Sequence, residues 1–416
     1  MIPDKVGHRL GTVGPGFANA HSHLFHRALR GRTHAEGGDF WRWREEMCAV
    51  AGTLDPRLYR SLARAVFGEM LSAGYTAVGE FHYVHHRPGG APYREPEHAM
   101  ERTVADAAQD AGIRLTLLDT LYLGGGLGRG LEPEQLRFGD GSAAAWLDRW
   151  HRLRSDLAGH RDVLLGAAIH SVPAVPEREI SALVAGLPAD VPLHIHLSEQ
   201  PRENEECLAA TGLTPTELLA RAGALSRRLS VVHATHLSDS DHDLLGGAGV
   251  AVVMCPSTEA DLGDGIGPAR ALAALGASVT IGSDQNAVID PLLELRGLEA
   301  GERLARHRRG VFSPAELWRA GTVDGYRALG WRGGISVGAV CDLVELDEES
   351  MRTLRAPAEA LPLVATAADI RTTIVGGRLV DTTGTTGLLA AALDALDEAR
   401  ERTDEPKAQI SGRPLR

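Results

Sequence analysis

Lysine is almost missing from this chain of 416 residues. Lys5 and Lys407 are the only two, beside 41 arginines. The interior of the chain therefore has no lysine that could form a Schiff base, link pyridoxal phosphate or complete a phosphate-binding loop. These three kinds of chemistry are excluded before any motif is considered.

Cysteine and long apolar runs are also scarce. The four cysteines are scattered and form no Cys-x-x-Cys pair, which argues against a disulfide framework and favours the cytoplasm. No apolar run reaches the length of a transmembrane helix, and the first residues lack the apolar stretch of a signal peptide, so no membrane partner is expected. The net charge of −12 comes from interspersed acids and bases, which argues against nucleic acid as a partner.

The chain does contain a regular alternation of short apolar, β-branched runs with helical patterns such as 57–73 and 97–111. This alternation is typical of βα units that build a parallel sheet. Eight runs fit a closed (β/α)8 TIM barrel of the α/β class, whose active site would lie at the carboxyl ends of the strands. The predicted strands are 17–20, 76–81, 114–121, 163–169, 192–197, 229–232, 250–255 and 278–281.

The pattern changes after a last helical region at 313–329. Residues 334–346 and 370–380 read as short antiparallel strands with glycine turns, which predicts a small β subdomain. A helix is expected over 386–402, followed by a polar, disordered tail. We therefore divide the chain into a short N-terminal segment of the β subdomain (1–13), the barrel (14–330), the small β subdomain (331–385) and a C-terminal helix and tail (386–416).

Histidines and one aspartate stand where four of the predicted strands end. His21 and His23 end the first strand, His196 the fifth, and Asp284 follows the eighth. His21 and His23 are two residues apart on extended chain, so both side chains leave the same face and can bind one ion. Three imidazoles and a carboxylate favour zinc over iron or manganese and leave a position for a water molecule. Metal-activated water points to hydrolysis. Without an interior lysine that could be carboxylated to bridge two ions, one divalent metal ion is expected.

Three further roles follow from the same strand ends. Glu199 lies three residues after His196, where its carboxylate can transfer a proton to a substrate nitrogen; the alternative is a first-turn helix acid beside Pro201. His233 can hold or deprotonate the attacking water, and Asp284 can accept the released proton besides binding the metal. For His236, a hydrogen bond that only supports the site is as good an interpretation as a catalytic role; for His233, it is the weaker of the two.

Two aromatic and basic segments, 40–45 and 80–86, are expected on loops above strands one and two, where a substrate lid belongs. An arginine there can bind a carboxylate through two hydrogen bonds. Packing on an amphipathic helix explains Trp41 and Trp43 equally well.

These residues together resemble the amidohydrolase superfamily and, within it, the formimidoylglutamate deiminases of histidine degradation. The similarity runs from about residue 14 to 380. It is carried by the strings Phe-Ala-Asn-Ala-His-Ser-His-Leu-Phe-His-Arg-Ala, Phe-Trp-Arg-Trp-Arg-Glu, Glu-Phe-His-Tyr-Val-His-His, Ile-His-Ser, His-Ile-His-Leu-Ser-Glu-Gln and His-Ala-Thr-His-Leu. The resemblance implies a barrel with one zinc ion that hydrolyses a formimidoyl C=N bond, releasing ammonia and leaving an N-formyl product.

The resemblance also assigns roles to single positions. The metal ligands carried over are His21, His23, His196 and Asp284, with Glu199 and His233 as the catalytic pair. The substrate-contacting positions carried over are His26, Arg44, Tyr83 and His170.

Three departures from the family pattern stand out. Pro173 replaces an arginine expected to hold a substrate carboxylate, a loss that corresponds to roughly 10- to 150-fold in affinity. Asn286 replaces an imidazole expected beside the metal. Only 20 residues precede His21, which is short for the usual N-terminal part of the β subdomain.

The preferred interpretation is therefore a metal-dependent iminohydrolase acting on formimidoylglutamate or on a related amidine that lacks one carboxylate. A deaminase of an aminated heterocycle such as a purine or pterin is the alternative enzyme, and a catalytically degenerate ligand-binding paralogue is the alternative of another class. Barrels of this kind often form homodimers, but no stripe of residues identifies an interface.

Overall fold

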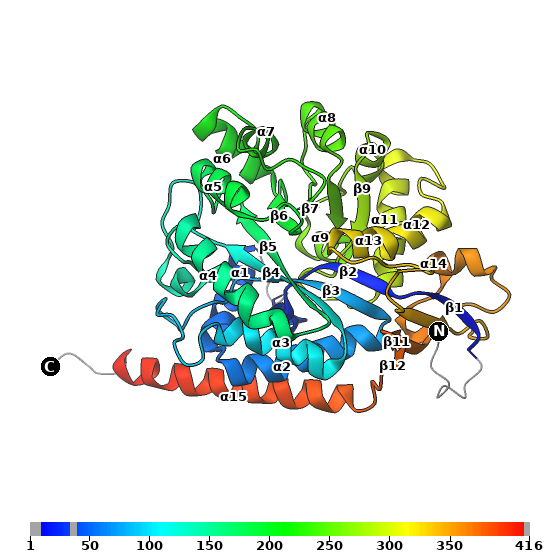
Figure 1. Cartoon of the computed structure of the whole chain (residues 1–416), viewed down its shortest axis with the longest axis horizontal. Helices are drawn as coiled ribbons and strands as arrows, with labels where there is room; N and C mark the ends of the chain where they lie inside the picture. Colours follow the sequence, from blue (N-terminus) through cyan, green and yellow to red (C-terminus); the bar gives the residue numbers. More distant parts are fainter. Residues whose placement is uncertain (1–9, 34–39, 412–416) are drawn as a thin grey trace.

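The computed structural model describes residues 10–33 and 40–411 and places a small sheet beside an eight-stranded barrel (Figure 1). The barrel strands are parallel and pair in chain order from β2 to β9. Its ring closes at the carboxyl end, where the amides of Ser283 and Asp284 donate to the carbonyl of His21 (3.1 and 3.0 Å). The barrel strands are β2 (Phe17–Ser22), β3 (Tyr75–His82), β4 (Arg114–Leu121), β5 (Val163–Ser171), β6 (Leu193–Leu197), β7 (Leu229–His233), β8 (Ala251–Met254) and β9 (Ser278–Ile281). The predicted fold is confirmed.

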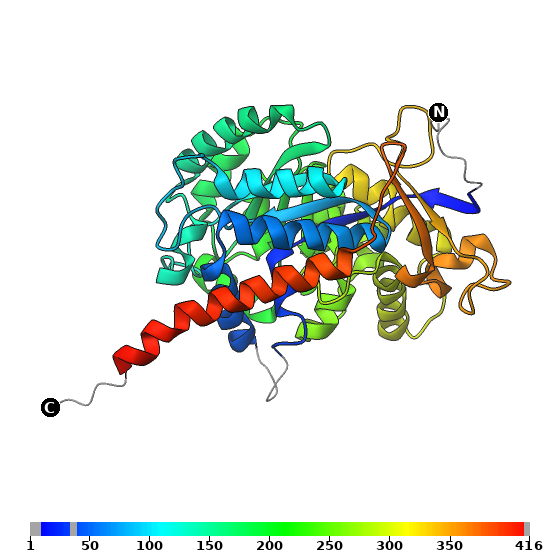
Figure 2. The same cartoon turned by 90° about the horizontal axis from the view of Figure 1, so that it is seen from below.

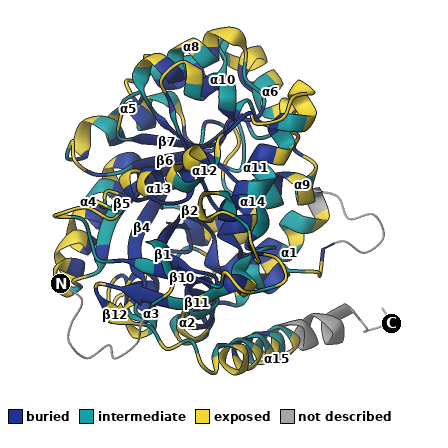
Figure 3. Cartoon of the chain, turned by 90° about the vertical axis from the view of Figure 1, so that its right-hand side faces the viewer, coloured by how far each residue is buried: buried dark blue, intermediate teal, exposed yellow. Residues whose placement is uncertain are grey.

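The barrel strands are buried on both faces, which explains why they read as nearly continuous apolar runs. Every residue of β3 and of β4 is buried. Figure 3 shows the labelled barrel strands, among them β4 to β7, as a largely buried centre, with exposed residues mostly on the surrounding helices and loops. The outer helices carry one buried stripe each, as in α2 (Pro56–Ser72), which begins at an N-cap, Asp55, whose side chain accepts from the Leu58 amide.

The helices around the barrel follow the strands as the pattern predicted. Their bounds are α3 (Ala99–Ala111), α4 (Ala143–Asp156), α5 (Glu177–Gly186), α6 (Pro201–Thr211), α7 (Pro215–Arg221), α8 (Asp239–Ala248), α9 (Pro256–Leu262), α10 (Ala269–Ala274), α11 (Pro291–Arg306), α12 (Pro314–Gly321) and α13 (Val323–Ala328). One expectation is wrong: the segment beginning at residue 40 is not a loop, because α1 (Phe40–Thr53) is helical throughout.

The smaller sheet has four antiparallel strands in the order β1 (Thr12–Pro15), β10 (Leu343–Leu346), β11 (Ile370–Val375) and β12 (Arg378–Leu379). A short helix, α14 (Leu361–Val364), lies between β10 and β11. Buried Asp342 ties this sheet to the barrel, because its carboxylate accepts from Arg114 on β4 (Nε to Oδ2, 2.6 Å) and from the amide of Gly376 (2.7 Å). The division into domains at residues 13, 330 and 385 stays a prediction.

The C-terminal helix, α15 (Thr385–Ser411), lies along α2 on the outside of the barrel (Figure 2). Arg32 and Asp397 form two hydrogen bonds of 2.5 and 2.8 Å that hold it there. The helix continues beyond the predicted end at Arg402 into the segment expected as a tail, and residues 412–416 lie outside the described chain. No helix in the described ranges is both long enough and apolar enough to cross a bilayer.

Candidate active site

Four side chains converge at the carboxyl end of the barrel. His21 lies on β2 and His23 directly follows that strand, while His196 comes from β6 and Asp284 from the loop after β9. Their ligand atoms all lie within 4.8 Å of one another. The Nε2 atoms of His21 and His196 are 3.1 Å apart, and the Nε2 atom of His23 is 3.3 Å from that of His196. Oδ1 of Asp284 lies 3.2 Å from Nε2 of His21 and 3.4 Å from Nε2 of His23.

The second ring nitrogens show that this cluster suits a cation. Nδ1 of His23 faces the carbonyl of Phe81 (3.0 Å), and Nδ1 of His196 faces the carbonyl of His170 (2.9 Å). A carbonyl only accepts, so both Nδ1 atoms carry the proton and both Nε2 atoms present lone pairs. Lone pairs 3.3 Å apart repel unless a shared positive centre lies between them. The donor set therefore fits one divalent metal ion bound by these four residues.

The protonation states of the cluster agree with this fit. Burial lowers the pKa of His21, His23 and His196, so the neutral imidazoles that bind metals are favoured. Burial alone would raise the pKa of Asp284, but the hydrogen bond to His21 and the surrounding imidazoles hold it well below its usual range. Asp284 is therefore an anionic donor.

A second group of side chains lies beside the four donors. Nε2 of His233 is 3.9 Å from Oε1 of Glu199 and 3.8 Å from Oδ2 of Asp284. Nδ1 of His233 faces the carboxylate of Glu259 at 3.4 Å, which orients the ring. Burial is the main cause that raises the pKa of Glu199, so its protonated form persists closer to neutral pH. Burial would lower the pKa of His233, but the negative charge of Glu199 and the hydrogen bond to Glu259 outweigh it and raise that pKa to about 10.

The backbone is strained at this end of the barrel. Positive φ angles, which are uncommon for residues other than glycine, occur at the ends of β6, β7 and β9. The residues are Ser198 (49°), His233 (67°), Ala234 (52°), Asp284 (42°) and Asn286 (56°). Three other non-glycine residues with positive φ lie elsewhere in the described chain. Strain of this kind collects at functional sites, where the surrounding structure holds it in place.

A cavity of about 410 Å³ opens above the four donors. His23, His196, Glu199, His233 and Asp284 line its inner end. The helix α1 contributes Trp43, Arg44 and Met47 to its wall, and Trp43 donates to Oε1 of Gln285 at 3.0 Å. The lid expected above strands one and two is thus partly a helix.

The four predicted substrate-contacting residues all line this cavity: His26, Arg44, Tyr83 and His170. Nε2 of His26 is hydrogen bonded to the hydroxyl of Tyr83 (2.9 Å). Burial lowers the pKa of His170 to about 3, so this ring is neutral. His236 lies apart from the cavity lining and bonds the carbonyl of Asp264 (2.8 Å), as a supporting role requires. Which of these residues touch a substrate stays a prediction.

The structure shows what the two altered positions do. Pro173 lines the cavity and contributes no charge. The side chain of Asn286 is used in hydrogen bonds to residues beside the metal-binding cluster: its Nδ2 donates to the carbonyl of His23 (2.9 Å) and to Oγ of Ser22 (3.1 Å), while its Oδ1 accepts from Ser283 (2.6 Å). Asn286 therefore braces the backbone that carries His21 and His23.

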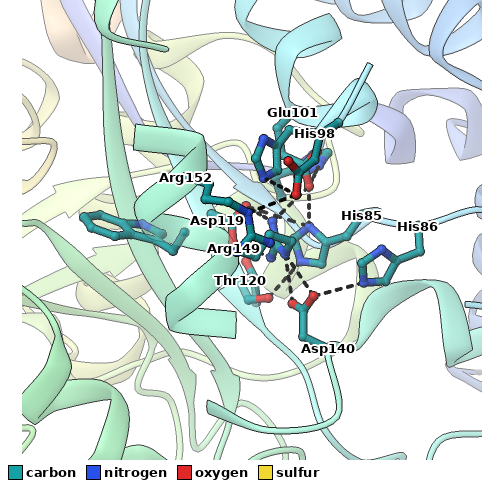
Figure 4. A network of polar contacts seen from close by, with 12 residues as sticks. His85, His86, His98, Glu101, Asp119, Thr120, Asp140, Arg149 and Arg152 are labelled. Carbon is teal, nitrogen blue, oxygen red and sulfur yellow. Dashed lines mark hydrogen bonds and ion pairs between the residues drawn. The ribbon is translucent and has the colours of Figure 1, made fainter. Parts of the chain in front are cut away.

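A separate buried network lies beyond the end of β3 (Figure 4). Arg149 on α4 bonds Asp119 through two nitrogens (2.7 and 2.9 Å) and also bonds Asp140 and Glu101. Nδ1 of His85 is 2.8 Å from the Glu101 carboxylate, and its Nε2 donates to the carbonyl of Thr120 at 2.9 Å. Both nitrogens of His85 therefore carry protons, in agreement with its raised pKa. The guanidinium and the imidazolium already balance much of the negative charge, so we interpret this network as a support for the strand ends.

Some residues of the site carry no signal of their own in the sequence. Glu259 lies behind His233 on α9 and could have been found as another carboxylate after a strand end, but nothing in the sequence pairs it with His233. Arg129 and Arg202 line the cavity. Arg202 lies just beyond the motif that contains His196 and Glu199, and Arg129 lies in a segment without a motif.

Comparisons with known proteins agree with this geometry. The model of the amidohydrolase family matches residues 12–380. A formimidoylglutamate deiminase from Pseudomonas aeruginosa is 39% identical over 84% of this chain and 80% of that protein. A 5-methylthioadenosine/S-adenosylhomocysteine deaminase from Natronomonas pharaonis is 28% identical over 88% of this chain and 81% of that protein.

A solved structure is similar as well. The crystal structure of an amidohydrolase from Brucella melitensis has a TM-score of 0.87 and 34% identity, and the match covers 95% of this chain and 91% of that one. The range matched by the family model, residues 12–380, includes every donor and cavity residue described above.

Proposed function

The chain belongs to the amidohydrolase family and is a hydrolase that acts on C–N bonds, and we propose that it hydrolyses a formimidoyl C=N bond with one bound zinc ion. The substrate that we propose is formimidoylglutamate or a closely related carboxylated amidine. The observation that carries this proposal is the cavity itself, which has three imidazoles (His23, His196 and His233) and two carboxylates (Glu199 and Asp284) at its inner end and arginines in its wall.

The metal ion would be held by His21, His23, His196 and Asp284. When bound, it would supply Lewis-acid activation of a water molecule at neutral pH. Zinc suits this mixture of imidazole nitrogen and carboxylate oxygen.

The residues beside the metal-binding cluster would each carry out one part of the proton transfer. His233, oriented by Glu259, presents Nε2 between two carboxylates, where it can hold the attacking water. The water oxygen bonds to the formimidoyl carbon, and Asp284 accepts the proton that the water loses. Glu199 gives a proton to the imino nitrogen, since burial favours its protonated form. Asp284 then passes the proton it accepted to the same nitrogen as the carbon–nitrogen bond breaks, and the hydroxyl of the adduct returns a proton to the Glu199 carboxylate. Ammonia leaves, and an N-formyl product remains.

The wall of the cavity would orient the substrate. Tyr83 and His26 are hydrogen bonded to each other, so the Tyr83 hydroxyl is held in place against the cavity. Arg44 on α1 offers a guanidinium that can bind a carboxylate through two nitrogens. The ring of His170 is neutral and is held in the same wall.

Ammonia release from formimidoylglutamate by the zinc-loaded protein tests the proposal. The wild type should release one ammonia per substrate, and Glu199→Gln should lower kcat by about 100- to 10,000-fold because it removes the proton donor. The bound zinc should be equal in the two proteins, because Glu199 is not among the four donors. No release by the wild type would reject formimidoylglutamate, and unchanged turnover by Glu199→Gln would reject the assigned role.

One second candidate has support from the 28% identical relative, a deaminase of an adenine-containing compound. The same assay with 5-methylthioadenosine and S-adenosylhomocysteine tests it. Turnover of these compounds above that of formimidoylglutamate would favour the heterocycle deaminase.

A further inference from the structure

The loop after β4 brings an arginine into the cavity wall. Residues 122–131 contain Gly124, Gly125 and Gly126, and the loop is closed by its own backbone: the Arg129 amide donates to the carbonyl of Gly126 (3.0 Å), and the Gly125 amide donates to that of Gly130 (3.1 Å). The Leu123 amide donates to the carbonyl of Ala174 (3.2 Å). The loop is therefore hydrogen bonded to the segment that holds Pro173.

Glycine is required where the arginine side chain folds back over this loop. A Cβ atom added to Gly126 would lie 2.3 Å from Nη2 and 2.7 Å from Nε of Arg129. Gly126 also has a φ of 154°, a conformation that other residues rarely adopt. A Cβ at Gly124 would lie 2.7 Å from the carbonyl oxygen of Arg129. The glycines thus leave room for the guanidinium to lie directly on the loop backbone.

The arginines that line the cavity differ in whether a carboxylate of the protein is paired with them. Arg202 is paired with Glu206 at 2.6 Å. Arg129 is exposed and lines the cavity, and no carboxylate in the described ranges is paired with it. Pro173, on the neighbouring segment, adds no charge to this wall. The guanidinium of Arg129 has its donors available to the cavity, and its planar fork matches the geometry of a carboxylate.

We propose that Arg129 forms a carboxylate-binding subsite of the active-site cavity and so selects substrates that carry a carboxylate beyond the reacting C=N bond. This inference rests on the proposed function for the identity of the substrate, while the subsite itself rests on the placement of the loop. Arg129 is a specificity-determining residue that acts by binding, so its loss should raise KM and leave kcat nearly unchanged.

Equilibrium binding to the zinc-loaded protein tests the subsite without turnover. The probe is N-formyl-L-glutamate, measured by titration calorimetry for the wild type, Arg129→Met and Arg161→Met. Arg161 is a matched control, because it is an exposed arginine two residues before β5, at the amino ends of the strands. Arg129→Met should bind the probe about 10- to 150-fold more weakly than the wild type, and Arg161→Met should bind it equally well. The exposed position of Arg129 lets both variants fold.

Kinetics supply the second measurement. On formimidoylglutamate, Arg129→Met should lose the same factor in kcat/KM, mainly through KM. On N-propylformamidine, which has the same three-carbon chain without a carboxylate, the variant and the wild type should have equal kcat/KM. A loss on both compounds would mean a general disturbance of the site and would overturn the inference.

The two proposals fail in different ways. If N-formyl-L-glutamate does not bind the wild type, or binds Arg129→Met within about threefold of the wild type, the subsite is wrong. If Arg129→Met weakens binding as expected but the wild type releases no ammonia from formimidoylglutamate, the subsite stands and the proposed function fails.

Discussion

The protonation state of a buried histidine in this protein depends on the groups that its two ring nitrogens contact. The ring of His196 has its Nδ1 proton fixed by the carbonyl of His170, which leaves Nε2 free for a metal. His85 has both nitrogens occupied, by Glu101 and by the carbonyl of Thr120, and therefore stays cationic. Both are buried histidines, yet one is suited to bind a metal and the other to balance carboxylates. A histidine count cannot distinguish the two, because the difference lies in backbone carbonyls contributed by other strands.

The buried network around Arg149 makes a prediction about acid stability. Burial alone would raise the pKa of Glu101, but the hydrogen bond to His85 and the charge of Arg149 lower it to about 2 from a usual 4.5. The stabilisation from its charged form is complete above about pH 4.5 and is lost as the pH falls toward 2. The free energy of unfolding of the wild type should therefore exceed that of Glu101→Gln most above pH 5, and the difference should shrink between pH 4.5 and 2.

Chemical denaturation of the two proteins across this pH range measures the difference. Both carry the same metal-binding cluster, so release of metal in acid cancels in the comparison. Glu348→Gln, at an exposed position in the loop after β10, should change stability by less than about 0.5 kcal/mol. A difference for Glu101→Gln that stays constant from pH 6 to pH 2 would show that the Glu101 charge does not stabilise the fold.

At the scale of elements, the sequence was enough for the barrel strands and for the helices that follow them. Parallel strands buried on both faces produce apolar runs, and these runs are visible without a structure. The sequence predicts a loop at residue 40 where the structure has the helix α1, because α1 has a mixed composition and packs over the cavity. Arg129 is not predicted for a similar reason: a glycine-rich loop reads as a turn, and its hydrogen bond to Ala174, which links it to the segment of Pro173, is not visible in the sequence.

The positions of the candidate ligands were also predictable from the strand ends, and the structure brings them together. Their roles remain predictions. The orientation of Asn286 is not predictable, because two of its three partners, Ser22 and the carbonyl of His23, lie more than 260 residues away in the chain.

The close contact between the ends of β9 and β2 lets us predict how a substitution at Gly282 changes stability and metal binding. A Cβ added to Gly282 would lie 2.8 Å from both Cβ and the carbonyl oxygen of His21, so the alanine must push the two strand ends apart. Gly282→Ala should lower the free energy of unfolding by about 1–3 kcal/mol and weaken metal binding, because His21 is displaced. Thermal melts and zinc content measure both effects.

Gly247→Ala is the matched control, since a Cβ at Gly247 within α8 meets no atom within 4 Å. It should keep full zinc content and a melting temperature at or above that of the wild type. Equal zinc content and equal stability for the two variants would show that the close approach at Gly282 does not matter.

For the whole molecule, the barrel holds residues from opposite ends of the chain at one point. β2 lies near the N-terminus, and the loop after β9 lies more than 260 residues later in the chain. Even so, Nε2 of His21 and Oδ1 of Asp284 are 3.2 Å apart. The helix α15 and the small sheet pack on the outside and do not line the cavity. The function proposed for the chain therefore depends on the closure of the barrel around a single cation.

Anomalous diffraction at the zinc absorption edge, from crystals of the zinc-loaded protein, tests that claim most directly. We expect one strong peak per chain, about 2.0–2.2 Å from Nε2 of His21, His23 and His196 and from a carboxylate oxygen of Asp284. No peak among these four residues, or a strong peak only at another place in the chain, would contradict it.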